Sequence, residues 1–75
     1  MNLSKAHLAK IEAIEKVIGV KLEAFAIKRN CFAVELPDSK YCSESSFYTA
    51  IYDTCRQYGI GRVEPCGVGR LSVIF

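Results

Sequence analysis

The sequence lacks most of the residues on which catalytic sites are built. Its only histidine, His7, falls in the first turn of an expected helix, where a histidine is usually a surface residue. General acid–base and nucleophilic catalysis commonly need such a group beside a second one, and nothing in the sequence brings His7 near a cysteine. The eight acidic residues are scattered, so paired catalytic carboxylates are not indicated. We therefore expect no catalytic residues and no enzyme.

Motifs for metals and nucleotides are also missing. The four cysteines lie far apart in the sequence and include no Cys-x-x-Cys pair, so they do not predict a metal site. Free cysteines commonly act as small apolar side chains, and we expect four free thiols and no cofactor. Segments 59–61 and 67–69 are fragments of glycine-rich phosphate loops, but neither precedes a helix. They are typical of a helix end and a hairpin turn.

Long apolar runs and a strong charge are absent too. No stretch approaches the roughly 18 apolar residues that indicate a membrane-spanning helix, and residues 1–5 do not resemble the start of a signal peptide. We therefore expect a cytoplasmic protein that does not enter a membrane. The formal net charge is only +2, whereas most nucleic-acid-binding domains are strongly basic.

Apolar residues, in contrast, are plentiful for so short a chain. The 75 residues fit a single domain, residues 1–75, and 51% of them are hydrophobic. A domain this small buries only about 60% of the surface that its unfolded chain exposes. Either the core is very full, or apolar surface faces another chain. We favour the second interpretation, which predicts a homodimer or a complex with a protein partner.

Two segments have the spacing of amphipathic helices. The first, residues 4–18, starts at the candidate N-cap Ser4 and stops before Gly19. The second, residues 44–58, follows Ser43, with Ser45 as the alternative cap, and stops before Gly59. The stripe expected to be buried on the first helix is Leu8, Ile11, Ile14, Val17 and Ile18. The stripe expected to be buried on the second is Phe47, Ala50, Ile51, Thr54 and Tyr58.

Shorter segments rich in apolar residues predict four strands, at 21–28, 31–36, 62–66 and 70–75. In the first strand, Phe25 and Ile27 point to one side and the intervening alanines to the other. The pair Arg29-Asn30 predicts a tight turn, since asparagine tolerates a positive φ.

The two halves of the chain, about 4–36 and 43–75, repeat this pattern of one helix and two strands. The pattern predicts an α+β fold of two αββ units (αββαββ). We expect a four-stranded antiparallel sheet with both helices packed on one face. The order of the strands does not follow from the pattern.

The second helix carries a further stripe beside its apolar one. Tyr48, Tyr52 and Arg56 recur every four residues, and Tyr41 lies just before the helix. Tyrosine and arginine are enriched among the residues that contribute most to binding at protein interfaces. We predict that these four residues bind a partner. The alternative is that the tyrosines only complete the edge of the core, with their hydroxyls in water.

These features favour a small non-enzymatic protein-binding module that occludes or bridges a partner's surface. An inhibitor of the kind carried by phages or mobile elements, such as an anti-defence protein, would fit. The partner is another protein or a second copy of the chain.

The alternative function is nucleic-acid binding. Lys28 and Arg29 lie at one expected hairpin tip, and Arg62 and Arg70 flank the other. If the two hairpins lie side by side, these residues form a basic rim. Phe25, on the open face of the sheet, could then stack on a base. The mild net charge and the lack of a second aromatic residue on that face argue against this function.

Overall fold

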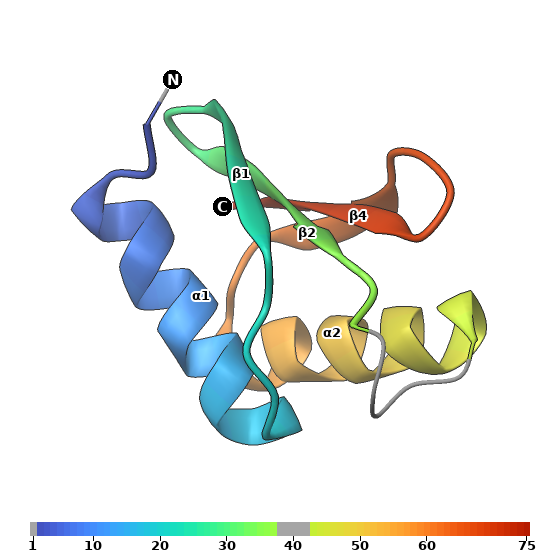
Figure 1. Cartoon of the computed structure of the whole chain (residues 1–75). Coiled ribbons are helices and arrows are strands. Elements are labelled where there is room, and N and C mark those ends of the chain that lie inside the picture. Colours follow the sequence, from blue (N-terminus) through green and yellow to red (C-terminus); the bar gives the residue numbers. More distant parts are fainter. Residues whose placement is uncertain (1, 38–42) are drawn as a thin grey trace.

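A computed structural model describes residues 2–37 and 43–75 of the chain (Figure 1). These residues form two helices and a four-stranded antiparallel sheet, which confirms the predicted α+β class. In chain order the elements are α1 (Lys5–Ile18), β1 (Ala24–Lys28), β2 (Cys31–Glu35), α2 (Glu44–Tyr58), β3 (Arg62–Pro65) and β4 (Arg70–Ile74). Neither described helix is both long and apolar enough to cross a bilayer.

Both helices begin and end at the residues that the sequence indicates. The Ser4 side chain accepts a hydrogen bond from the His7 backbone, and the His7 side chain accepts one from the Ser4 backbone. This reciprocal pair is a capping box in which histidine takes the place of the usual glutamate. Ser43, not Ser45, caps α2. Gly19 and Gly59 end the helices at φ 77° and 67°, a conformation that glycine adopts without strain.

The strands lie in the order β1-β2-β4-β3, with each neighbouring pair antiparallel. In the central pair, Cys31 lies opposite Ile74 and Glu35 lies opposite Arg70. The turns of the two hairpins therefore lie at opposite ends of the sheet, and Figure 1 shows them pointing in different directions. The strands β2 and β3 run parallel on either side of β4, and α2 connects them in a split βαβ arrangement.

Residues from both helices and from alternate positions of the strands form one hydrophobic cluster. Its most deeply buried large side chains include Ile14, Ile51, Phe32 and Phe47. The cluster is Ile11, Ile14, Ile18, Leu22, Phe32, Val34, Phe47, Ile51, Cys55, Ile60, Val63, Leu71 and Val73.

The buried stripes differ from the predicted ones at the edges. In α1, His7 is buried, whereas Leu8 and Val17 are exposed. In α2, Cys55 is buried, whereas 52% of Tyr58 is exposed. The predicted stripes were wrong at these positions because helical periodicity gives a direction only to within about one residue. The rotation of each helix against the sheet decides which neighbour is buried.

Two details of the first hairpin also differ from the prediction. No residue other than glycine has a positive φ among the described residues, so Asn30 does not make the turn in the predicted way. Instead, the register between β1 and β2 shifts between Ala26 and Lys28, and this bulge adapts the twist of the strands. The strand begins at Ala24, later than predicted, and just before it the backbone of Leu22 donates a hydrogen bond to the Glu15 carboxylate.

Candidate functional site

The predicted stripe on α2 forms a continuous aromatic surface. The rings of Tyr48 and Tyr52 are stacked, with centroids 6.0 Å apart and planes 14° apart. Tyr52 is 44% exposed, whereas Tyr48 is half-buried and packs against the core. Arg56, one turn further along α2, is exposed, and no ion pair joins it to a carboxylate within the described residues. The spacing of four residues thus places all three side chains on one side of α2.

The tyrosine stripe lies against β3, which sequence analysis did not predict. The Tyr48 hydroxyl is 3.4 Å from the carbonyl oxygen of Val63 and donates a hydrogen bond to it. One hydrogen bond of the β3–β4 ladder joins the Cys66 backbone to Arg70. In an antiparallel ladder the pairing alternates, so the main-chain groups of Val63 and Pro65 point to the outer edge. At this edge the Tyr48 hydroxyl donates its hydrogen bond to the Val63 carbonyl, and Pro65 has no N–H group that could donate one.

A small hollow of about 150 Å³ lies at the junction of α2 and β3. Tyr52 and Arg56 contribute to it from the helix, and Arg62 and Val63 from the strand. Arg62 forms a weak, exposed ion pair with Glu64, at 3.3 Å. The hollow therefore combines an aromatic wall with two guanidinium groups, a pattern that suits an acidic side chain next to an apolar one. We call Tyr48, Tyr52, Arg56 and this hollow the α2–β3 surface.

Tyr41, the fourth predicted partner-binding residue, lies outside the described residues. It therefore contributes nothing to the geometry above.

The structure does not bring the four predicted basic residues together. Lys28 and Arg29 lie at the turn of the β1–β2 hairpin, and Arg62 lies at the same end of the sheet because it pairs with Ile74. Arg70 begins β4 at the opposite end, opposite Glu35. The hairpin turns are not side by side, so a single basic rim does not form.

Arg70 is engaged by its neighbours on the sheet. Its Nη2 donates a hydrogen bond to Glu35 Oε1 at 2.6 Å, and its guanidinium carbon lies 5.3 Å from the centroid of the Phe25 ring. The hydrogen bond from Arg70 lowers the pKa of the Glu35 carboxyl. Phe25 is exposed. Its ring, however, already has the Arg70 guanidinium beside it.

A second hollow, of about 340 Å³, lies on the same face of the sheet. Small side chains make its floor, and longer ones surround it: Ile27, Lys28, Asn30, Cys31, Arg62, Cys66, Ser72 and Ile74. Burial raises the pKa of the Cys31 thiol. The lining holds thiols and a hydroxyl, and no carboxylate or imidazole that would activate them belongs to it.

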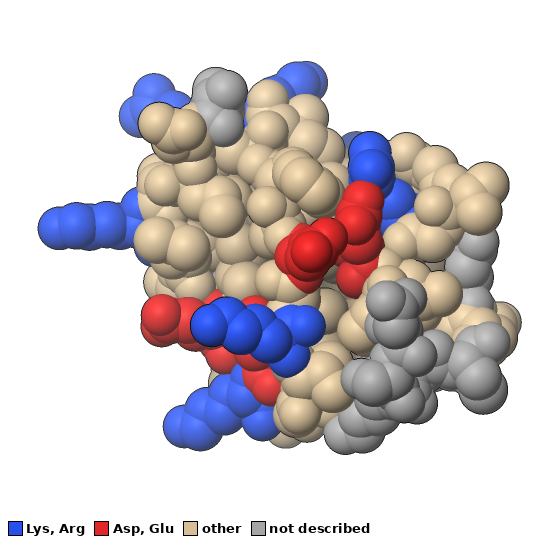
Figure 2. Space-filling view, in the orientation of Figure 1, with Lys and Arg blue, Asp and Glu red and all other residues tan. Residues whose placement is uncertain are grey.

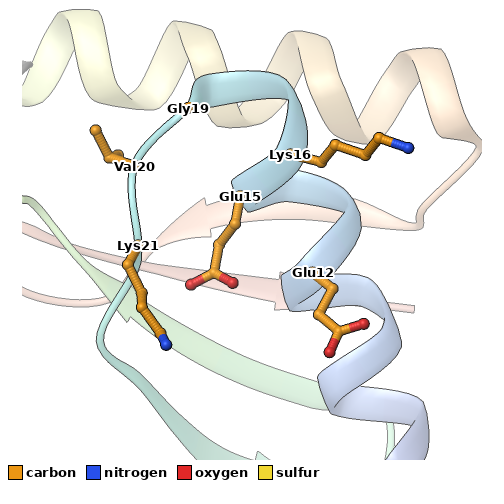
Figure 3. Close-up of a pocket in the computed structure, with 6 residues that line it drawn as sticks. All are labelled: Glu12, Glu15, Lys16, Gly19, Val20 and Lys21. Carbon is orange, nitrogen blue, oxygen red and sulfur yellow. The ribbon is translucent and has the colours of Figure 1, made fainter.

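Figure 3 shows a third, shallow hollow of about 430 Å³ at the end of α1. The Glu15 side chain points towards the segment that follows Gly19, where Glu15 Oε2 lies 2.7 Å from the Leu22 nitrogen and accepts its hydrogen bond. The acidic residues Glu12 and Glu15 and the basic residues Lys16 and Lys21 line this hollow together. The two acidic and two basic side chains balance in charge, and the Glu15 carboxylate is hydrogen-bonded to the Leu22 backbone.

Two residues have roles that the sequence did not reveal. His7 was predicted to lie on the surface, and that prediction is wrong, since only 1% of it is exposed. Cys55 is buried in the core, and burial raises the pKa of its thiol to about 11. The cap position of Ser4 was the one signal that could have indicated an inward direction for His7.

Cys31, Cys55 and Cys66 are free thiols, and Cys66 is the exposed one. Cys42 lies outside the described residues. Within residues 2–37 and 43–75, no group of three or more histidine, cysteine or acidic side chains could hold a metal ion. No protein family, curated protein or solved structure matches this chain.

Proposed function

We propose that the chain is a non-enzymatic protein-binding module that occludes or bridges a partner through its α2–β3 surface. The observation that carries the proposal is the stacked pair of Tyr48 and Tyr52. The inner ring is anchored on the core and the outer ring is exposed next to Arg56. Anchored aromatic residues bind at a small cost in conformational entropy because they are already ordered before the partner arrives.

The charges suggest which partner chemistry fits this surface. Arg56 has no carboxylate partner within the described part of the chain, and Arg62 is shared only with the exposed Glu64. A partner that presents an acidic side chain beside an apolar one would pair with a guanidinium and cover the Tyr52 ring. Occlusion of such a patch on a larger protein is the mode of action that we propose.

The proposal includes the arrangement of the two αββ units. We infer that α1 and α2 cover the same face of the sheet, because both contribute to one cluster with Phe32, Val34 and Val73. The side chains that alternate with these, such as Phe25 and Ile27, then belong to the open face. In this arrangement the α2–β3 surface lies at one border of the sheet.

The test uses the chain as bait in the host from which it comes. The wild type and the variants Tyr52→Ala, Arg56→Ala and Tyr58→Ala are captured in parallel, and the bound proteins are quantified by mass spectrometry. Tyr58 is the matched control, since it is an exposed tyrosine of the same helix outside the stripe. A protein retained by the wild type and Tyr58→Ala, but lost from the other two variants, is the expected result.

The partner is then purified and its affinity measured. We expect Tyr52→Ala to weaken binding by at least about 2 kcal/mol, the scale of an interface hot spot. Equal binding by Tyr52→Ala and Tyr58→Ala would refute the proposed site.

Nucleic-acid binding is the second candidate function, and an oligonucleotide-binding assay distinguishes it from the first. Arg70 is engaged by Glu35 and Phe25, and the basic residues lie at two ends of the sheet. We therefore expect little binding to single-stranded oligonucleotides in fluorescence anisotropy at physiological salt. Sub-micromolar affinity that is lost on charge reversal at Lys28, Arg29 and Arg62, and that falls steeply with salt, would instead favour this candidate.

A further inference from the structure

The two edges of the sheet differ in their main-chain groups. At the β3 edge, Tyr48 occupies the carbonyl of Val63 and Pro65 has no N–H. The β1 edge has neither a proline nor, within the described residues, a side chain hydrogen-bonded to the Ala24 or Ala26 carbonyl. The Glu35 backbone N–H donates a hydrogen bond to the Glu23 carbonyl oxygen at 3.0 Å. This bond shows which residues of the segment point their main-chain groups towards β2 and which point them outward, because the two directions alternate along an antiparallel pair. Phe25 therefore pairs with β2, whereas the N–H and C=O groups of Ala24 and Ala26 point outward.

These outward groups have no hydrogen-bond partner within residues 2–37 and 43–75. Natural edge strands are usually protected from pairing by proline, by a charged side chain in the strand, by a β-bulge or by a covering element. The strand β1 is Ala24-Phe25-Ala26-Ile27-Lys28; it has no proline, and its one charged residue and its bulge both lie after Ala26. The β1 edge therefore has the features of a strand that accepts another strand.

Apolar surface lies on both sides of this edge. On the open face, Phe25 and Ile27 are exposed. On the side of α1, a groove of about 380 Å³ lies between the helix and the chain leading into β1. Its apolar lining is Leu3, Leu8, Ile11, Leu22 and Ala24, and the charged residues Glu12, Glu15 and Lys21 complete it. Figure 2 shows a broad area without charged side chains over the N-terminal part of α1 and β1.

We propose that the occupant of this edge is β1 of a second copy, paired antiparallel about a two-fold axis at Ala26. The sequence around Ala26 is complementary to itself in this register. Each Phe25 lies beside Ile27 of the other copy, so the two exposed apolar side chains cover each other. Each Glu23 lies near the basic Lys28-Arg29 end of the other copy's β1, where the bulge ends the one-to-one register. The charge at the start of the strand thus meets the opposite charge at its end.

The pairing gives one continuous eight-stranded sheet with a closed, symmetric interface. The outward main-chain groups of Ala26 bind their equivalents across the axis. The α2–β3 surface lies at the far border of each sheet and stays accessible, so the dimer would present two copies of it. This inference rests on β1 alone and does not depend on the proposed function of α2.

The first experiment measures self-association by sedimentation velocity over a dilution series. We expect the wild type to dimerise at micromolar concentration. Ala26→Pro removes the outward N–H and leaves the ladder with β2 intact, since proline is tolerated on an edge where the N–H faces solvent. It should raise the dissociation constant at least about tenfold. Val68→Lys, at an exposed apolar site in the β3–β4 turn, should leave the dissociation constant unchanged.

The second experiment tests the register and remains decisive if Ala26→Pro fails to fold. Glu23→Arg and Arg29→Glu each place like charges together twice in a homodimer, so each should weaken self-association at least about threefold. Mixing the two variants restores both opposite-charge pairs, so the mixture should form heterodimers as tight as the wild-type dimer. A monomeric wild type, an unaffected folded Ala26→Pro variant, or a mixture no tighter than its components would overturn the proposal.

Discussion

The imidazole of His7 joins the first turn of α1 to the end of β1, with Nε2 2.6 Å from the carbonyl oxygen of Lys28. Because a carbonyl only accepts hydrogen bonds, Nε2 carries the proton. The other ring nitrogen, Nδ1, accepts the Ser4 N–H at 2.9 Å. Both geometries require the neutral tautomer protonated on Nε2. Phe32 and Phe75 meet the ring edge-on, at centroid distances of 6.0 and 5.7 Å.

Replacing His7 with alanine should therefore destabilise the domain. The change leaves the Ser4 N–H and the Lys28 carbonyl without their partner and opens a cavity between two phenyl rings. We expect a loss of about 2–4 kcal/mol in the free energy of unfolding, measured in urea. Lys5→Ala, at an exposed position of the same turn, should change it by less than about 0.5 kcal/mol. Equal stability of the two variants would show that His7 has no structural role, and a nitrogen NMR spectrum showing protonated Nδ1 would contradict the tautomer.

Tyr48 and Tyr52 should differ in their contribution to stability, although they share one face. Tyr48→Ala removes a half-buried ring that packs against the core, so it should cost about 2 kcal/mol. Tyr48→Phe keeps the ring and loses only the long hydrogen bond to Val63, so it should cost less than about 1 kcal/mol. Tyr52→Ala should cost less than about 1 kcal/mol because the ring is largely exposed. A Tyr52→Ala variant as unstable as Tyr48→Ala would place both rings in the core and weaken the interface interpretation.

The thiols should react at very different rates in the folded protein. Cys66 is exposed, whereas burial raises the pKa of Cys31 and raises that of Cys55 to about 11, so that both stay protonated near neutral pH. Since the thiolate is the reactive form, an aromatic disulfide reagent should modify Cys66 long before Cys31 and Cys55. Peptide mapping identifies the modified residue, and Cys66→Ser is the control that removes labelling of the peptide containing position 66. Rapid modification of Cys55 under native conditions would contradict its burial.

The same pKa shift predicts a loss of stability in alkaline solution. The pKa of the Cys55 thiol has its ordinary value of 9.0 in the unfolded chain, whereas burial raises it to about 11 in the folded one. Between these values the unfolded chain releases a proton that the folded chain keeps, so stability falls as the pH rises. Cys55→Ala should lose this part of the pH dependence in urea titrations at alkaline pH values on either side of the ordinary thiol pKa of 9.0. An unchanged pH dependence in the variant would assign the effect to other groups.

Gly61 should be intolerant of any side chain. A Cβ built at this position overlaps the carbonyl oxygen of Ile74 in the neighbouring strand, so the β3–β4 ladder would have to move apart. We expect Gly61→Ala to cost about 3 kcal/mol. Gly59→Ala is the comparison, since a Cβ there meets no atom and the cost, about 1 kcal/mol, comes only from the positive φ. Thermal unfolding of both variants gives the two values, and a Gly61→Ala variant no less stable than Gly59→Ala would contradict the close approach.

The composition of the α2–β3 surface was predictable only in part. The spacing of Tyr48, Tyr52 and Arg56 placed them on one face of a helix, because this depends on helical geometry alone. Their contact with Val63 was not predictable, since it depends on the strand order, which places β3 at one border of the sheet. The same is true of Arg70, whose partner Glu35 is 35 residues away in the sequence.

By itself, the sequence determined where the helices start and end and which side chains alternate along the strands. Ser4, Gly19, Ser43 and Gly59 act through hydrogen bonds and backbone angles within one turn of helix, so their effects are local. Only the tertiary structure decided the strand order, the burial of His7 in place of Leu8, and the difference between a closed β3 edge and an open β1 edge. These features depend on contacts between residues far apart in the chain, whose pairing is selected by the packing of the whole core.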